Sequence, residues 1–234
     1  MIPWLGPGDP FPPVERALTE PNGLLAAGAD LSRRRLVDAY ARGIFPWFGD
    51  DDPLLWWSPD PRMVLWVHEV HASKSLRRVI RSGRFTVTLD TAFADVMAGC
   101  AAPRADQDGT WITDEMTAAY LDLAAHGEAH SVEVWHDGSL AGGLYGVAIG
   151  RMFYGESMFT RVSNASKVAI ACLATQLTRW GFELIDCQMS TSHLASLGAR
   201  EIPRAEFLQH VRRLIGQPAP ASPWRLDRDL VETL

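Results

Sequence analysis

Residues 152–188 read MFYGESMFTRVSNASKVAIACLATQLTRWGFELIDCQ and contain two short apolar segments with a longer one between them. Met152 to Phe159 and Phe182 to Gln188 have the length and composition of buried strands. Between them, Ser163 to Trp180 places apolar side chains at helical spacing, and Gly181 follows as a stop signal. The stretch therefore predicts a strand, a long helix and a second strand.

The flanking segments continue this pattern in both directions. Val132 and Val134 mark a strand, Asp137-Gly138 is a strong hairpin-turn signal, and Leu140 to Ile149 is the returning strand. Strands joined in hairpins, followed by a long helix and a further strand, predict an α+β fold with helices packed on a mixed central sheet. The other predicted elements are a strand over 85–89 and helices over 71–81, 91–101, 113–123, 194–198 and 204–215.

The first 62 residues differ from the rest in their proline content. They hold ten of the 15 prolines, and proline cannot donate a backbone hydrogen bond to a helix or sheet. One helix fits there, capped by Ser32 and ended by Gly43. We therefore expect a small Pro-rich N-terminal domain over residues 1–62 and a main domain over residues 63–234.

The overall composition excludes several protein classes. Of the 234 residues, 47% are hydrophobic and 21% are charged, which rules out disorder, collagen and coiled coil as the main description. The formal net charge of −6 argues against a generally basic nucleic-acid coat. It does not exclude a local basic patch, because binding responds to the local field.

The cysteines, histidines and N-terminus indicate a compartment. Cys100, Cys172 and Cys187 are odd in number and widely spaced, so they form neither a self-contained disulfide framework nor a zinc motif. We expect structural or surface roles for His126 and His130. The N-terminus lacks the features of a secretory signal, and no apolar run approaches the ~20 residues of a membrane span. These observations predict a cytoplasmic protein that contacts no membrane.

Glu156 stands in an apolar strand, where a carboxylate is costly unless it is paired. Side chains alternate along a strand, so we expect Tyr154, Glu156 and Met158 to share one face. The structural interpretation is an ion pair with Lys167 or Arg151. The functional interpretation is a carboxylate that belongs to a site.

Asp186 and Gln188 are two residues apart and should face the same side of their strand, with Ile185 and Cys187 on the other side. A polar pair on a central strand needs partners or a function. Together with Glu156, the pair could form a pocket that orients and deprotonates an amine nucleophile. No nucleophile-elbow motif, Cys/His dyad or P-loop suggests covalent catalysis.

A basic run follows residue 73. Lys74, Arg77, Arg78 and Arg81 fall on one face of the predicted helix. A solvated face is the ordinary interpretation of such a stripe. Phosphate binding is the alternative, because the chain is otherwise acidic and no carboxylate interrupts the stripe. Arg33 to Arg35 form a weaker second patch.

Tryptophans add a second binding signal. The apolar residues around Trp47 and Trp57 either fill the seam between the two domains or form a stacking wall for a ligand. Trp111, just before a predicted helix, could lie at a pocket rim or anchor the core.

Nine short motifs stand in order over roughly residues 11–215. Any one of them is weak, but nine in order at plausible spacings are highly specific. They are EPNGLLA (20–26), RGIFPWF (42–48), LWWSPDPR (55–62), GTWIT (109–113), YGV (145–147), GESMF (155–159), NASK (164–167), IDCQ (185–188) and SLGA (196–199). Together they resemble the leucyl/phenylalanyl-tRNA–protein transferase family.

This resemblance implies an aminoacyltransferase. Its donor would be leucyl-, phenylalanyl- or sometimes methionyl-tRNA, and its acceptor the α-amino group of a protein that begins with Arg or Lys. The new N-terminus would be a degradation signal of the bacterial N-end pathway. The resemblance also implies a GNAT-like acyltransferase domain after a small N-terminal domain, a monomer, and no metal or acyl-CoA cofactor.

The resemblance further implies roles for individual residues. Gln188, tied to Asp186, would contact the acceptor amine and assist its deprotonation, and Glu156 would help to bind the substrates. Trp47 and Trp111 would flank the terminal adenosine. The basic positions Lys74, Arg77, Arg78 and Arg81 would meet acceptor-stem phosphates. The aminoacyl pocket would be formed by Leu144, Phe153, Met158, Ile170, Leu173, Leu177 and Ile185.

Three rival functions fit parts of the sequence less well. An acyl-CoA acetyltransferase of the same fold should have a glycine-rich pyrophosphate loop after a strand, and the sequence has none. An aminoacyl-tRNA-dependent cell-wall ligase usually needs two acyltransferase domains, more than 234 residues allow. A non-enzymatic RNA-binding module would not need Glu156, Asp186 and Gln188 on strand faces.

Overall fold

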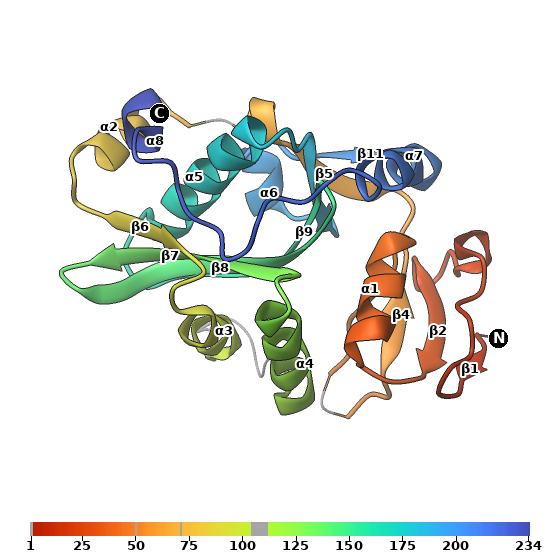
Figure 1. Cartoon of the computed structure of the whole chain (residues 1–234). Helices are drawn as coiled ribbons and strands as arrows, with labels where there is room; N and C mark the ends of the chain where they lie inside the picture. The colour runs from red at the N-terminus through yellow and green to blue at the C-terminus, as the bar shows by residue number, and fades with distance from the viewer. Residues whose placement is uncertain (1, 50, 71, 104–111) are drawn as a thin grey trace.

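Two β-sheets organise the chain, as Figure 1 shows. This computed structural model describes residues 2–49, 51–70, 72–103 and 112–234. The first sheet has four strands in the order β1-β2-β4-β3, and the second has seven in the order β11-β5-β10-β9-β8-β7-β6.

The small sheet belongs to the N-terminal part of the chain. The predicted helix is present as α1 (Arg33–Ala41). The Ser32 hydroxyl accepts the Arg35 N–H at its start, and Gly43 follows its end with φ +72°, a conformation that favours glycine. The sequence predicts only this helix among residues 1–62, whereas the structure adds four short strands. Pairing between strands, rather than residue propensity, holds strands this short. The remaining elements are β1 (Trp4–Leu5), η1 (Val14–Arg16), β2 (Leu24–Gly28), β3 (Phe45–Pro46) and β4 (Leu55–Trp57).

The large sheet is mixed. Strands β6 to β9 are antiparallel, β9 and β10 are parallel, and β5 pairs antiparallel with both β10 and β11. The α+β fold class, with a mixed central sheet flanked by helices after a small N-terminal domain, is confirmed. The strands are β5 (Arg62–Trp66), β6 (Thr86–Leu89), β7 (Ala129–His136), β8 (Ser139–Ile149), β9 (Met152–Thr160), β10 (Leu184–Gln188) and β11 (Arg200–Ile202).

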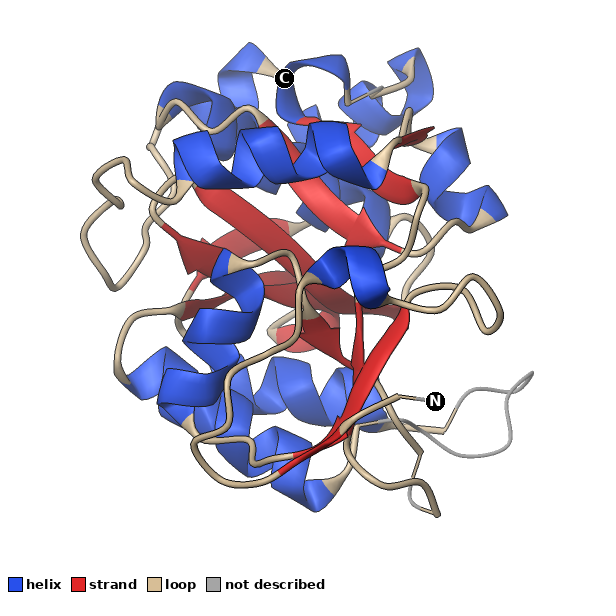
Figure 2. Ribbon diagram, turned by 90° about the vertical axis from the view of Figure 1, so that its right-hand side faces the viewer, coloured by secondary structure: helices blue, strands red, loops and turns tan. Residues whose placement is uncertain are grey.

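Helices cover both faces of this sheet. In Figure 1, α5 lies on one side of β7 and β8 while α3 and α4 lie on the other, and Figure 2 shows the twisted strands enclosed between helices. The helices are η2 (Val67–Glu69), α2 (Lys74–Arg81), α3 (Phe93–Ala101), α4 (Asp114–Ala125), α5 (Ala165–Arg179), α6 (Ser192–Ser196), α7 (Arg204–Leu214) and α8 (Leu230–Thr233).

The two sides of the sheet have separate apolar clusters. One, here called the tyrosine face, contains the buried residues Tyr40, Tyr120, Tyr145 and Tyr154 and packs against α1, α3, α4 and α7. The other, the aliphatic face, packs against α2 and α5. Its buried members around β9 and α5 are Leu144, Phe153, Ile170, Leu173, Leu177 and Ile185.

A bulge in β9 changes which face of the sheet its side chains point to. Glu156 has no opposite residue in the pairing of β8 with β9. One extra residue shifts the alternation of side chains. Tyr154 therefore lies on the tyrosine face, whereas Met158 pairs with Leu144 and packs on the aliphatic face. The expectation that Tyr154, Glu156 and Met158 share one face is wrong for this reason.

Two sequence expectations remain untested by the fold. The small sheet ends with β4 at Trp57 and the large sheet begins with β5 at Arg62, but the boundary between residues 62 and 63 stays a prediction. Within the described ranges, no helix has the length and apolar character needed to cross a bilayer. The cytoplasmic location stays a prediction.

Candidate active site

The centre of the large sheet opens where two parallel strands part. Within these fully described strands, β9 pairs with β10 only at Phe153 and Tyr154. Beyond this point, residues 155–158 of β9 and 187–188 of β10 are partly exposed although both strands are central. Solvent therefore reaches the place where the two strands part. We call these partly exposed residues, which include Glu156 and Gln188, the recess.

Glu156 is held by three neutral donors. The Tyr40 hydroxyl donates to Glu156 Oε1 at 2.8 Å, the Tyr120 hydroxyl donates to Oε2 at 2.9 Å, and Gln188 Nε2 donates to Oε1 at 2.9 Å. The two tyrosine hydroxyls also hydrogen-bond to each other. Helix α1 of the N-terminal part, helix α4 and strand β10 thus meet at one carboxylate.

Burial raises the pKa of Glu156 to about 7. Hydrogen bonds from the tyrosines favour the charged form and oppose the effect of burial, while repulsion from Asp186 adds to it. The same burial raises the pKa of Tyr40 and Tyr120 well above its ordinary value, so both hydroxyls stay protonated. Glu156 can therefore exchange a proton near neutral pH.

Asp186 has different surroundings. It is fully buried, and its two oxygens accept from Nε and Nη2 of Arg62 at 2.8 and 2.6 Å. The Arg62 guanidinium is also fully buried. It lies between the rings of Phe45 and Phe207, 4.7 Å from each centroid, and donates to the Gly43 carbonyl. Three donors, two from Arg62 and one from the Gln188 backbone, therefore hold the Asp186 carboxylate in place.

Gln188 joins the two carboxylates. Its backbone N–H donates to Asp186 Oδ1 at 2.8 Å, while its side chain donates to Glu156. Its φ of +63° lies in the left-handed region, which is strained for a residue other than glycine and is typical of functional sites. Since Nε2 is directed at Glu156, Oε1 is left as the acceptor on the other side of the amide.

The structure thus brings together the three residues that the sequence singled out for a pocket. The structural interpretation of Glu156, an ion pair with Lys167 or Arg151, is wrong. In the part of the chain that the structure describes, Glu156 has hydroxyl and amide donors and no cationic partner. Neutral donors stabilise the carboxylate without fixing it in the charged state.

Sequence reasoning missed three members of the site: Arg62, Tyr40 and Tyr120. Arg62 stands at the end of the motif LWWSPDPR with no role of its own, and Tyr40 and Tyr120 lie within predicted helices, where an aromatic side chain ordinarily belongs to the core. A signal existed in each case. An arginine at the start of an apolar strand needs a buried carboxylate, and a tyrosine in a core stripe needs a partner for its hydroxyl.

The seven residues expected to form an aminoacyl pocket lie around the aliphatic face. Met158 is partly exposed at the recess, while the other six are buried between the sheet and α5. Trp47 is 39% exposed and packs edge-on against Trp57, with 5.6 Å between ring centroids. Trp111 lies outside the described residues. The binding roles of all these residues stay predictions.

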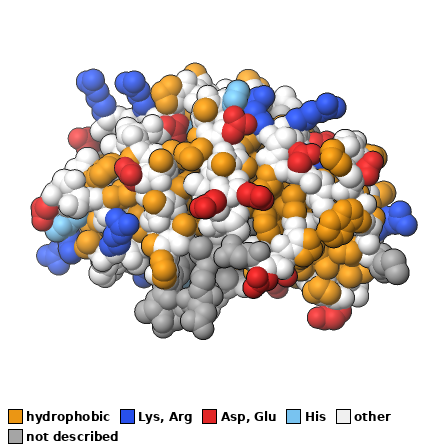
Figure 3. Space-filling view, turned by 90° about the horizontal axis from the view of Figure 1, so that it is seen from below, with side chains coloured by type: hydrophobic (Ala, Val, Ile, Leu, Met, Phe, Trp, Pro, Cys, Tyr) orange, Lys and Arg blue, Asp and Glu red, His pale blue; other side chains and the backbone are white. Residues whose placement is uncertain are grey.

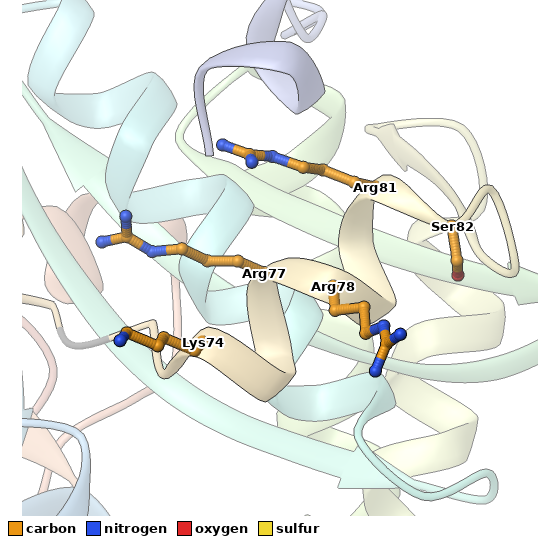
Figure 4. A pocket seen from close by; sticks show the side chains of 5 residues that line it. All are labelled: Lys74, Arg77, Arg78, Arg81 and Ser82. Carbon is orange, nitrogen blue, oxygen red and sulfur yellow. The ribbon is translucent and has the colours of Figure 1, made fainter.

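The basic run forms a local surface feature. Lys74, Arg77, Arg78 and Arg81, with Ser82, line a surface pocket of about 480 Å³ on α2. Figure 4 shows Lys74, Arg77 and Arg81 extending in one direction while Arg78 points to the other side of the helix. All four basic residues therefore lie around one pocket, but only Lys74, Arg77 and Arg81 extend in the same direction.

The second basic patch is weaker than its sequence indicates. Arg33 forms an ion pair with Glu128, and Arg35 is buried with its guanidinium over the ring of Phe11. In the view from below in Figure 3, Lys and Arg lie mainly along the margins while acidic and hydrophobic side chains occupy the middle.

The histidines have structural surroundings. His130 is stacked on Trp224 with 3.6 Å between ring centroids and bonds to Asp90, and His126 is exposed beside Asp122. Among the described residues, no group of three or more His, Cys, Asp or Glu side chains is arranged to hold a metal ion.

Two family models match the chain. The one described as leucyl/phenylalanyl-tRNA protein transferase matches residues 64–212. The one described as the N-terminal domain of that transferase matches residues 29–60.

Curated relatives match over nearly their whole length. A leucyl/phenylalanyl-tRNA–protein transferase from Nitrosospira multiformis is 59% identical over 232 residues, covering 99% of this chain and 100% of the relative. Proteins of the same name from Saccharophagus degradans and Laribacter hongkongensis are 59% and 57% identical, covering 93% and 96% of this chain and 90% and 97% of the relatives.

Solved structures show only distant likeness. The structure of L-PGS from Bacillus licheniformis has a TM-score of 0.37 at 9% identity, covering 71% of this chain and 53% of that one. A GCN5-related N-acetyltransferase from Kribbella flavida has a TM-score of 0.35 at 11% identity, covering 70% and 59%. Scores this low carry no argument. From the family models and the curated relatives, the chain belongs to the leucyl/phenylalanyl-tRNA–protein transferase family.

Proposed function

We propose that this chain transfers a leucyl, phenylalanyl or methionyl group from aminoacyl-tRNA to the α-amino group of a protein that begins with Arg or Lys. The observation that carries the proposal is the meeting of Glu156, Asp186 and Gln188 at a recess in the sheet centre. The new N-terminus is a degradation signal. The enzyme acts as a cytoplasmic monomer without metal or acyl-CoA, and its domains divide between residues 62 and 63.

The reaction requires no covalent enzyme intermediate, because an aminoacyl ester is already activated. The enzyme must hold donor and acceptor together and keep the attacking amine neutral. Gln188 suits the acceptor amine, since two separate contacts fix it and its Oε1 is directed away from Glu156. An N–H of the amine donates to this oxygen.

The donor occupies the other side of the same strands. Its side chain enters between β9, β10 and α5, where Met158 is the accessible member of an aliphatic wall. A flexible thioether accommodates both Leu and Phe. Trp47 and Trp111 flank the terminal adenosine. The four basic residues of α2 meet acceptor-stem phosphates, and α2 packs on α5 over the aliphatic face.

The test is transfer of label from leucyl-tRNA to a peptide. Radiolabelled leucyl-tRNA is incubated with the enzyme and a peptide that begins with Arg, and the peptide is sequenced from its N-terminus. We expect labelled leucine ahead of the arginine. An otherwise identical peptide that begins with Glu is the control and should stay unlabelled. Absence of label on the Arg peptide would contradict the proposal.

A further inference from the structure

The two carboxylates of the site differ in how their oxygens are occupied. Asp186 is fully buried and bound in bidentate fashion by the Arg62 guanidinium. Glu156 receives only neutral donors and lies at the partly exposed recess. Carboxylates in such different surroundings take different roles in proton transfer.

We propose that Glu156 is the proton acceptor of the transfer reaction, and that Asp186 positions Gln188 without taking part in proton transfer. This inference rests on the proposed function. It differs from the resemblance, which implied that Gln188, tied to Asp186, assists deprotonation and that Glu156 helps to bind the substrates. In the structure both Asp186 oxygens accept from Arg62, and Oδ1 also accepts from the Gln188 backbone.

Glu156 both receives and returns the proton that is transferred in the reaction. The acceptor nitrogen attacks the ester carbonyl carbon, so a C–N bond forms and the ester C–O bond breaks. The Glu156 carboxylate takes the proton that leaves the nitrogen through one bridging water, because Gln188 Oε1 holds the amine on the side of the amide away from Glu156. It returns this proton to the ribose oxygen as that oxygen leaves, which regenerates the carboxylate. No oxidant, reductant or further reactant is consumed.

The hydroxyls around Glu156 can serve both of its protonation states. A tyrosine hydroxyl is both a donor and an acceptor, and Tyr40 and Tyr120 already hydrogen-bond to each other. When Glu156 gains a proton, its O–H can donate to one of these oxygens, and that hydroxyl can turn toward its neighbour. Tyr145 packs edge-on against Tyr120, and its buried hydroxyl has no hydrogen-bond partner among the described residues.

The charges that face Glu156 support exchange near neutral pH. The groups around it are Tyr40 from α1, Tyr120 from α4, Tyr145 from β8, and Gln188 and Asp186 from β10. The charged member is Asp186, which Arg62 compensates. Burial raises the pKa of Glu156 to about 7, close to the ~7.7–8.0 of an ordinary α-amine, so the proton can move between them.

The first test is the pH dependence of single-turnover transfer. Wild type is compared with Glu156→Gln and Glu133→Gln at saturating substrates, using two Arg peptides whose amines differ in pKa. Glu133 is the matched control, since its carboxylate is likewise held by hydroxyls, those of Thr88, Thr91 and Ser131, but is fully buried within the same sheet. We expect wild type and Glu133→Gln to share an acid limb near pH 7 that does not move with the peptide. Glu156→Gln should lose this limb and at least ~100-fold of the rate.

A second measurement separates proton transfer from a structural role. Tyr40→Phe or Tyr120→Phe removes a donor that stabilises the Glu156 carboxylate, so its pKa rises and the acid limb moves up by roughly half to one pH unit. Tyr154→Phe removes a buried hydroxyl that donates to the Tyr40 carbonyl instead, and should leave the limb in place.

Two outcomes would overturn the inference. One is an acid limb that persists in Glu156→Gln, above all if Asp186→Asn abolishes it. The other is a limb that neither Tyr40→Phe nor Tyr120→Phe moves. Absence of transfer by the wild-type enzyme would instead contradict the proposed function, so the two failures are distinguishable.

Discussion

The tyrosine face and the aliphatic face meet at the same two strands but are built on different principles. On the tyrosine face, the two carboxylates of the site have specific partners, as Asp186 has Arg62 and Glu156 has two tyrosines. On the aliphatic face, β9 and β10 present Phe153, Met158 and Ile185 to α5. Along β9, the bulged residue Glu156 lies between Tyr154 on the tyrosine face and Met158 on the aliphatic face.

The two faces should respond differently to substitution. A buried polar network is costly to leave half-satisfied, because the remaining group is desolvated without compensation. An aliphatic wall depends on volume and tolerates changes of shape. Substitutions on the tyrosine face should therefore act through charge and pH, and substitutions on the aliphatic face through substrate fit.

The largest effect is expected at Arg62. Arg62→Met leaves Asp186 buried without its partner, which costs about 3–5 kcal/mol of unfolding free energy. The double variant Arg62→Met/Asp186→Leu removes both charges and should recover most of this loss. The free energy of unfolding of both variants is measured by urea denaturation. A single variant within ~1 kcal/mol of wild type would show that the tyrosine face does not depend on this ion pair.

The next effect concerns Glu156 and pH. Its carboxyl titrates near 4.5 when unfolded and near 7 when folded, so the folded state binds more protons between these values. Stability should therefore fall as pH rises from about 4.5 to about 7, by up to ~3 kcal/mol. Glu156→Gln removes this contribution and should be more stable than wild type at pH 8.

Urea unfolding at several pH values checks this expectation. The quantity is the difference in unfolding free energy between Glu156→Gln and wild type, since groups shared by both proteins cancel. A difference that stays constant from pH 5 to pH 8 would show that Glu156 does not titrate in this range.

The helix layer over the aliphatic face supplies a third comparison. Neutral replacement of Lys74, Arg77, Arg78 and Arg81 should flatten the log–log salt dependence of tRNA binding by about 2–3 units, as each phosphate contact adds roughly 0.7–0.9. Arg212→Gln, an exposed arginine on α7, is the control and should change little. An unchanged slope in the quadruple variant would place the RNA contact elsewhere, with Arg34 the next candidate.

The smallest effect is a change of donor preference on the aliphatic face. Met158→Ala removes side-chain volume from the aliphatic wall, which enlarges the space for the substrate side chain at the recess. Leucine then loses contacts, while phenylalanine can still fill much of the space, so the kcat/KM ratio of phenylalanyl-tRNA over leucyl-tRNA should rise several-fold. Both donors are measured with one Arg peptide. A flat donor ratio with a changed acceptor preference would assign Met158 to the acceptor side.

Much of the fold could be predicted from local sequence. The Ser32 cap and Gly43 end of α1 are where the sequence placed them, as is the Asp137-Gly138 turn, where both residues have positive φ. The strand pattern predicted one side for Asp186 and Gln188. The register of β10 with β5 shifts between them, and the Gln188 backbone N–H donates to Asp186. Caps, turns and alternation depend on neighbours within a few residues, so they can be read without the fold.

The partners of the buried polar groups required the tertiary structure. Glu156 meets a tyrosine that lies 116 residues before it, and Asp186 meets an arginine 124 residues away. No periodicity encodes such pairs, because they depend on how α1 and β5 pack against β9 and β10. The bulge was equally hidden, since alternation along β9 assumes an unbroken register with β8.

Local sequence patterns were enough to predict the α+β class, the order of most elements, the family resemblance and three polar residues of the candidate site. The folded chain was needed to learn that one carboxylate binds a buried guanidinium while the other binds hydroxyls at the partly exposed recess. The reason is physical: secondary structure follows from local backbone preferences, whereas burial and the partners of a charge depend on segments that meet only when the chain has folded.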